Sequence, residues 1–230
     1  MQRVIMLTSS TDMALLRLLQ LSSVSLPVGG YSFSQGLEYA IDCAWLKNAH
    51  DIEQWTALQM SESIARLELP ILRLSMLALA DGDIQKLAQY NELSLASRES
   101  KELRLTDTAM GEALARLMRN QGIEVPFART QEVSFVVLFA VAANHWHINY
   151  ATTALGFTWS WLENQIAAAT KLVPLGQTQA QQLLGNLQQN IMTAIDNAQT
   201  IEAHDIGSCL PALAIASALH ETQYSRLFRS

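Results

Sequence analysis

Apolar residues recur three and four positions apart along almost the whole chain, which is the spacing of one face of an α-helix. The pattern predicts helices at residues 11–22, 34–45, 97–120, 176–197 and 208–224. Another begins near residue 51 and continues toward a turn at Gly82, and Asp83 can begin the next helix. Pro70 either kinks the helix it interrupts or divides it in two.

The stretch between Arg129 and Lys171 contains no basic residue, and its only acidic residues are Glu132 and Glu163. A helix that is apolar on all sides is normally buried at the centre of a domain. We therefore expect one or two core helices here, broken near residue 149 or residue 156. The run VSFVVLF would also suit a strand, but the sequence offers no second strand to pair with it.

These elements predict an all-α fold, a helical bundle of roughly eight to ten helices in a single domain. The domain covers residues 1–230, and we expect residues 1–10 and 225–230 to be flexible termini. Half of the residues are hydrophobic and 16% are charged, which excludes an intrinsically disordered chain. The net charge of −6 excludes the basic surface typical of nucleic-acid-binding proteins.

The cysteines and the chain ends bear on the compartment. Cys43 and Cys209 do not have metal-type spacing and do not suggest a disulfide framework, which favours a reducing compartment. The N-terminal residues lack the pattern of a secretory signal. The longest apolar run, residues 133–143, is too short to span a bilayer. We therefore expect a cytoplasmic protein with no membrane or nucleic-acid partner.

The common catalytic patterns are missing from the sequence. The segment SFSQG at residues 32–36 lacks the first glycine of a nucleophile elbow, and the same loop lacks the Gly-Lys-Ser/Thr ending of a phosphate-binding loop. His145 and His147 would point to nearly opposite sides of a helix, so they could share a metal ion only if the local backbone were extended, and we expect one or two partly buried histidines at a helix end instead. Glu99 and Glu102 have the positions of ordinary cap and surface acids.

The sequence thus predicts no catalytic residue, no metal site and no cofactor. A helical protein without such a site is more often a binding or scaffold protein than an enzyme. An all-α enzyme or a small-ligand-binding protein with an unrecognised site is the alternative from another functional class.

One extended stretch rich in glycine, serine and proline, SSVSLPVGGYSFSQG at residues 22–36, interrupts the helices. Glycine and proline in a turn need no partner, so the stretch is compatible with a purely structural connection. It is also long for a helix-to-helix connection, and long ordered loops often carry function. Both interpretations stay open from the residues alone.

Three stretches repeat motifs that occur together in one family. They are LLQLSSVSLPVGGYSFSQGLEYA at residues 18–40, AAATKLVPLGQTQAQ at 167–181 and LAIASALHETQYSRLFRS at 213–230. The first keeps Leu-Pro-x-Gly-Gly-Tyr/Phe-Ser-x-Ser-x-Gly-Leu-Glu, the second Pro-Leu-Gly-Gln, and the third His-Glu-x-x-Tyr-Ser-Arg-Leu-Phe. In this order and at these separations they resemble the urease accessory protein family UreF from end to end, with residues 47–130 less diagnostic.

The resemblance implies a non-enzymatic helper in the maturation of a nickel enzyme. Members of the family are all-α and tend to dimerise. They bind the accessory protein UreD or UreH and then the GTPase UreG, and the assembly docks on the urease apoprotein, where nickel is delivered. Regulation of the GTPase is a further implied role. A scaffold with several partners needs apolar surface, so we expect the isolated protein to be poorly soluble and its partner to relieve this.

The resemblance assigns partner-binding residues to three surfaces. The first is the loop and the start of the following helix. The second is a short segment that begins with a lone lysine, and the third is the C-terminal tail. Their members are Pro27, Gly29, Gly30, Tyr31, Phe33, Ser34, Gln35, Gly36 and Glu38; Lys171, Pro174, Leu175, Gly176 and Gln177; and Tyr224, Arg226 and Arg229.

Each surface also has a plainer interpretation as structure. Lys171 would favourably neutralise a helix C-terminus, and terminal residues are usually frayed unless something holds them. We hypothesise that the tail becomes ordered when the UreD/UreH partner binds, and that it then packs toward the loop at Tyr31.

Overall fold

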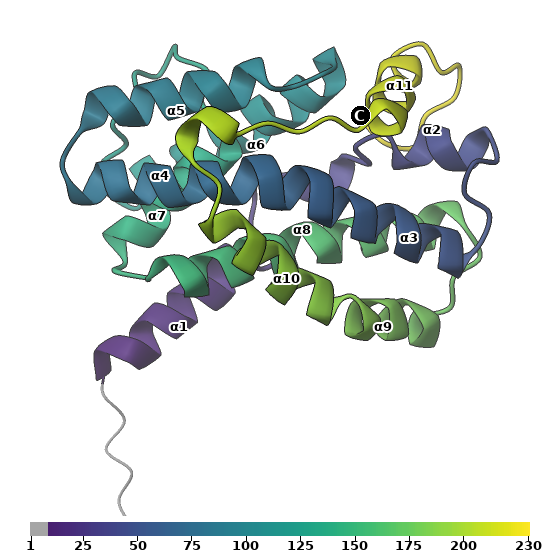
Figure 1. Ribbon diagram of the computed structural model, residues 1–230, viewed down its shortest axis with the longest axis horizontal. Coiled ribbons are helices and arrows are strands. Elements are labelled where there is room, and N and C mark those ends of the chain that lie inside the picture. Colours follow the sequence, from purple (N-terminus) through teal and green to yellow (C-terminus); the bar gives the residue numbers. More distant parts are fainter. Residues whose placement is uncertain (1–8) are drawn as a thin grey trace, which may run out of the picture.

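The computed structural model describes residues 9–230, and these form a bundle of helices without a β-strand (Figure 1). We predicted that residues 1–10 are flexible, and residues 1–8 of this segment lie outside the described residues. In chain order the α-helices are α1 (Ser9–Leu21), α2 (Leu37–Asp42), α3 (Ala49–Gln59), α4 (Leu69–Ala80), α5 (Ile84–Ala96), α6 (Lys101–Asn120), α7 (Phe135–His145), α8 (Tyr150–Leu172), α9 (Gln177–Asn186), α10 (Gln188–Gln199) and α11 (Pro211–His220). The predicted all-α fold is confirmed.

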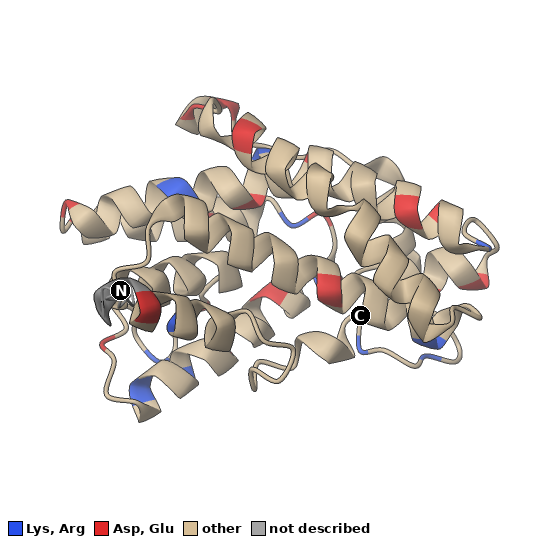
Figure 2. Cartoon of the chain, turned by 90° about the horizontal axis from the view of Figure 1, so that it is seen from below, with Lys and Arg blue, Asp and Glu red and all other residues tan. Residues whose placement is uncertain are grey.

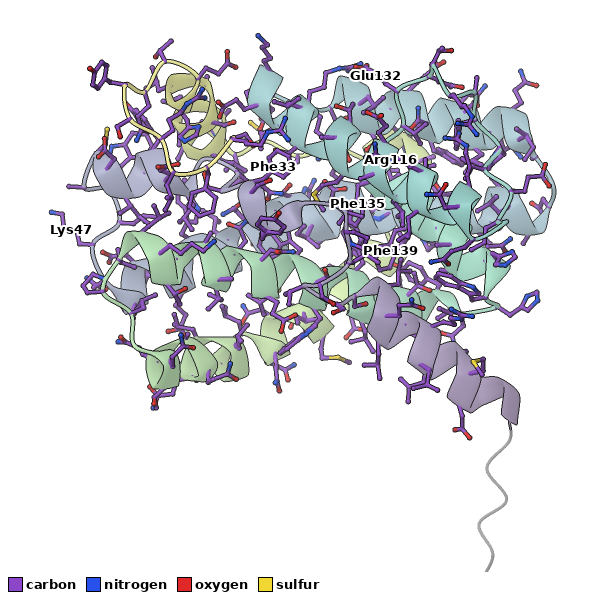
Figure 3. The ribbon with its side chains drawn as sticks, turned by 180° about the vertical axis from the view of Figure 1, so that it is seen from behind. Phe33, Lys47, Arg116, Glu132, Phe135 and Phe139 are labelled. Carbon is purple, nitrogen blue, oxygen red and sulfur yellow. The ribbon has the colours of Figure 1, made fainter. Side chains whose placement is uncertain are left out.

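Helix α7 lies at the centre of the bundle, packed against α4, α6 and α8. Every residue from Val136 to Ala143 is buried, as expected for a helix with no polar side. Phe135 and Phe139, labelled in Figure 3, pack edge-on or tilted against Phe157 of α8, with ring centroids 5.3–6.1 Å apart. The prediction of a buried helical core in the charge-poor stretch is confirmed, and the alternative of a strand is wrong.

The core stretch is broken near residue 149, which is one of the two positions predicted for the break. His147 has a positive φ of 54°, and the side chain of Asn149 accepts a hydrogen bond from Thr152 N at 3.0 Å, which caps the start of α8. The other predicted position, Gly156, lies inside α8, and α1 crosses there: a Cβ at Gly156 would lie 2.5 Å from Leu18 Cδ1 and from Ser22 Oγ. The glycine permits a close helix crossing and does not end the helix.

Pro70 lies in the first turn of α4, so the predicted helix is divided there, but by a change of helix type and not by a loop. A π-helical stretch, Met60–Glu68, joins α3 to α4, and Leu69 N–H donates to the carbonyl of Ile64, five residues earlier. Proline has no backbone N–H, so Pro70 cannot donate a hydrogen bond to the carbonyl of Arg66, four residues earlier. That carbonyl accepts a hydrogen bond from Gly207 N at 3.2 Å instead. The wider helical turn and this long-range donor let α3 and α4 follow one another in one line (Figure 1).

Charged residues are sparse and spread over the helices, as Figure 2 shows. Within residues 9–230, none of the helices combines the length and the apolar content needed to cross a membrane. The chain folds back at its end, so that the C-terminus lies beside α2 and α11 (Figure 1). This return brings the glycine-rich loop and the tail together.

Candidate functional site

The loop at residues 27–36 is a compact turn that depends on two glycines with positive φ. Gly29 has φ 76° and precedes a 3₁₀ turn over Gly30–Ser32, and Gly36 has φ 82° and precedes α2. A Cβ at Gly36 would lie 3.1 Å from Ser217 N, so this glycine also lets the loop approach α11 closely. The loop is therefore shaped by backbone requirements and by contact with a distant helix.

The side chains of the loop divide into an inner and an outer set. Phe33 and Ser34 are buried, whereas Tyr31 is 64% exposed. Gln35 has a positive φ of 53°, which is unusual for a residue other than glycine. Its Oε1 accepts hydrogen bonds from Trp161 Nε1 at 3.0 Å and from Gln165 Nε2 at 3.3 Å, which hold the loop onto α8.

The C-terminal tail, residues 221–230, packs along this loop. Arg229 N donates to the carbonyl of Ser32 at 2.8 Å, and the carbonyl of Ser230 accepts from Ser34 N and Gln35 N. Ser230 Oγ is hydrogen-bonded to Thr106 Oγ1 of α6. Phe228 and Ser230 are buried. We call the surface formed by residues 27–38, Lys171 and the tail the tail–loop face.

This arrangement differs from the expected flexible tail at residues 225–230. The backbone N–H groups of Leu227 and Phe228 donate to the carboxylate of Glu38 at 2.6 and 2.9 Å, so the tail has side-chain as well as backbone partners. Tail residues that bury an aromatic ring and pair their backbone groups are tied down. The role of a partner in ordering the tail stays a prediction.

A largely buried cluster of ionisable side chains lies where the tail leaves α11. His220, the last residue of α11, is fully buried. Its Nδ1 lies 2.7 Å from Glu102 Oε2 and its Nε2 lies 2.9 Å from Glu38 Oε2. Arg226 Nη1 donates to the second oxygen of Glu102 at 2.9 Å. The four side chains connect α2, α6, α11 and the tail.

Two cations lie over aromatic rings on the tail–loop face. Lys171 Nζ is 5.4 Å from the ring centre of Phe228, and the guanidinium carbon of Arg229 is 5.6 Å from that of Phe33. Both distances suit cation–π attraction. Lys171 also lies in the last turn of α8, where a cation is favourable. The structural and functional interpretations of Lys171 are therefore compatible.

A cavity of about 100 Å³ lies beneath the loop. Phe33, Gln35 and Phe135 contribute to its wall. Two buried side-chain atoms at this cavity, Gln59 Nε2 and Gln165 Oε1, have no hydrogen-bond partner among the described residues. A cavity of this size with polar atoms in its wall is large enough to hold ordered water.

The structure brings together most of the residues assigned to partner binding, but not all. The loop, Glu38, Lys171, Arg226 and Arg229 share the tail–loop face, and Figure 3 labels Phe33 within it. Tyr224 lies near the beginning of the same tail segment with its side chain fully exposed. Residues 174–177, Pro174 to Gln177, form the turn into α9, and no hydrogen bond joins them to the loop or the tail within the described part of the chain.

Sequence reasoning missed two buried residues that contact the tail–loop face. Glu102 lies in the first turn of α6, as expected of a cap acid, but it is 4% exposed, so its assignment as a surface acid is wrong. His220 is the first residue of the C-terminal motif, yet nothing local distinguishes it from the other histidines. The available signal was the pairing of a carboxylate in the first motif, Glu38, with a histidine in the third. Helical spacing alone does not reveal such pairs, because 118 positions separate His220 from Glu102.

No group of three or more His, Cys, Asp or Glu side chains suited to hold a metal ion occurs among residues 9–230. His145 and His147 are both exposed at the end of α7. The features of the site are thus those of a surface: exposed aromatic and cationic side chains on a fixed backbone.

Comparison with known proteins gives a consistent result. A family model described as UreF matches residues 46–188. A protein named urease accessory protein UreF from Marinomonas sp. (strain MWYL1) is 62% identical over 221 residues, which cover 96% of each chain. Proteins of the same name from Chromohalobacter salexigens and Pseudomonas entomophila are 42% and 41% identical, covering 95% and 96% of this chain and 95% and 100% of their own lengths.

Proposed function

Because the chain belongs to the UreF family, we propose that it is a urease accessory protein, required for nickel incorporation and for maturation of the urease active site. It acts as a non-catalytic scaffold or chaperone. In this role it bridges the UreD/UreH accessory protein and the GTPase UreG, and regulates GTP hydrolysis by UreG. The assembly then acts on the urease apoprotein in the cytoplasm.

The observation that carries this proposal is the convergence of separate sequence motifs on the tail–loop face. The loop motif and the C-terminal motif, nearly two hundred positions apart, meet through backbone hydrogen bonds at Ser32, Ser34 and Gln35. Lys171, which lies in the second motif stretch, joins them through Phe228. A surface held together from distant segments is suited to present a fixed shape to a partner.

The outward side chains of this face have the chemistry of a protein interface. Tyr31 is 64% exposed and Tyr224 is fully exposed. Tyrosine and arginine are the residue types that most often dominate binding energy at interfaces. Since neither tyrosine is buried in the chain itself, their exposure is explained if a partner covers them.

We also propose that the protein is a homodimer. Its apolar surface supports self-association: α1 leaves Met13, Leu15, Leu16 and Leu19 more than half exposed. Exposed apolar side chains concentrated on one helix mark an interaction surface more often than a solvated one.

A deletion strain tests the cellular role. Removing this chain is expected to abolish nickel-dependent urease activity, and re-expressing it is expected to restore the activity. A strain that lacks the chain and still makes fully active urease would contradict the proposal.

Co-purification tests the scaffold role and the face. Wild-type chain is expected to recover both UreD/UreH and UreG, and Arg226→Ala to recover less UreD/UreH. Arg116→Ala, which removes an exposed arginine from α6, is the matched control and is expected to behave as wild type. Equal recovery by all three proteins would exclude the tail as part of the interface.

A further inference from the structure

His220 is placed so that both of its ring nitrogens face a carboxylate. Nδ1 is 2.7 Å from Glu102 and Nε2 is 2.9 Å from Glu38, and the ring is fully buried. A neutral imidazole has one N–H donor and one acceptor nitrogen. Carboxylates that are ionised only accept hydrogen bonds, so a neutral ring would satisfy one of these contacts and oppose the other.

The partners of the two carboxylates indicate that both are ionised. Glu38 accepts two backbone N–H groups, from Leu227 and Phe228, and Glu102 accepts from the guanidinium of Arg226. Hydrogen bonds donated to a carboxylate stabilise its charged form. The extra proton of the cluster therefore belongs on His220.

The charges of the cluster balance only in that state. Glu38 of α2, Glu102 of α6 and Arg226 of the tail are the charged groups that face His220. Two negative charges and the arginine leave one negative charge in a buried site, and an imidazolium neutralises it. The position of His220 at the end of α11 adds to this, because a cation is favoured at a helix C-terminus.

We propose that His220 is a positioning residue that carries protons on both ring nitrogens and, as an imidazolium between Glu38 and Glu102, forms the latch that holds the C-terminal tail on the loop. Glu38 is the central member of the cluster. Its Oε2 contacts His220, and its two carboxylate oxygens accept from the tail backbone N–H groups of Leu227 and Phe228. Fixing Glu38 fixes Leu227 and Phe228, and Phe228 in turn lies under Lys171. The latch thus shapes the face that, on the proposed function, binds the partner.

Nitrogen NMR of the ring tests the protonation state directly. Wild-type protein labelled with ¹⁵N at histidine is expected to give two protonated ring nitrogens for His220 at neutral pH. In Glu102→Gln, the amide can donate to Nδ1, so we expect Nδ1 to lose its proton and Nε2 to keep its own. A single protonated nitrogen in the wild-type protein would overturn the proposal.

Hydrogen exchange tests the latch itself. In His220→Gln the side-chain amide can donate to one carboxylate, but its oxygen must face the other. The amides of Leu227 and Phe228 are therefore expected to exchange about tenfold faster or more, as for loss of a hydrogen bond to a charged group. His204→Gln, which changes an exposed histidine beside Asp205, is the control and should leave these amides unchanged. Unchanged exchange in a folded His220→Gln protein would also overturn the proposal.

The effect of the latch on partner binding rests on the proposed function. The experiments nevertheless distinguish a wrong latch from a wrong proposed function. Faster tail exchange with weaker UreD/UreH binding supports both. Faster tail exchange with unaltered UreD/UreH binding supports the latch and contradicts the tail–loop face as a partner surface. The NMR measurement does not depend on any partner.

Discussion

At the residue scale, Arg98 connects the segments around the core through a buried ion cluster. Its guanidinium binds Glu68 and Asp107, and the three side chains are 12%, 9% and 6% exposed. Burial alone would lower the pKa of Arg98, but the charges of Asp107 and Glu68 outweigh it and raise that pKa. Asp107 also accepts from Phe135 N at 2.7 Å, which satisfies a backbone donor at the start of α7.

Replacing Arg98 is therefore expected to be costly. Arg98→Met leaves two buried carboxylates without their cation, so the free energy of unfolding should fall by about 3–5 kcal/mol. Urea denaturation measures this. Lys86→Met removes the cation from an exposed pair with Asp83 and should change stability by about 1 kcal/mol at most. Similar losses in the two variants would show that Arg98 has no special structural role.

At the element scale, the features that could be predicted are those with a local cause. The apolar composition of α7 requires that it is buried, wherever its neighbours lie. Asp83 caps α5 by accepting a hydrogen bond from the backbone N–H of Lys86, three residues later. The π-helical stretch before Pro70 could not be predicted, because the donor that completes it is Gly207, far along the chain. Tertiary partners decide such departures from a regular helix.

The attachment of α1 to α8 is expected to depend on Gly156. Leucine at this position would occupy the space of Leu18 and Ser22, whose atoms already lie 2.5 Å from an added Cβ. In Gly156→Leu we expect the amides of α1 to exchange faster, with those of α7 unaffected. Gly185→Leu on α9, where an added Cβ meets nothing within 4 Å, is the control. Normal protection of α1 in Gly156→Leu would contradict this account of the crossing.

At the scale of the whole molecule, the low charge content has two structural causes. Part of it is the buried α7 and the inner side of α8. The rest is apolar surface, most evident on α1. The fold class could be predicted from sequence, whereas the joining of Glu38, Glu102 and His220 required the three-dimensional arrangement of segments distant along the chain.

The exposed leucines of α1 are expected to limit solubility. Leu16→Lys/Leu19→Lys should reduce concentration-dependent light scattering of the isolated protein without changing its circular dichroism, because both residues are 59% exposed. Leu77→Lys/Ile84→Lys removes exposed apolar side chains from α4 and α5 and should have a smaller effect. A wild-type protein that stays monomeric at high concentration would contradict the expectation.

The affinity for the UreD/UreH accessory protein tests the central claim, that the tail–loop face is a partner surface, most directly. Tyr31→Ala/Tyr224→Ala removes two exposed aromatic rings that make no hydrogen bond in the structure described for residues 9–230. Calorimetric titration is expected to show affinity weakened by about tenfold or more, while Leu77→Ala on α4 binds as wild type. Unweakened binding by the folded double variant would contradict the account.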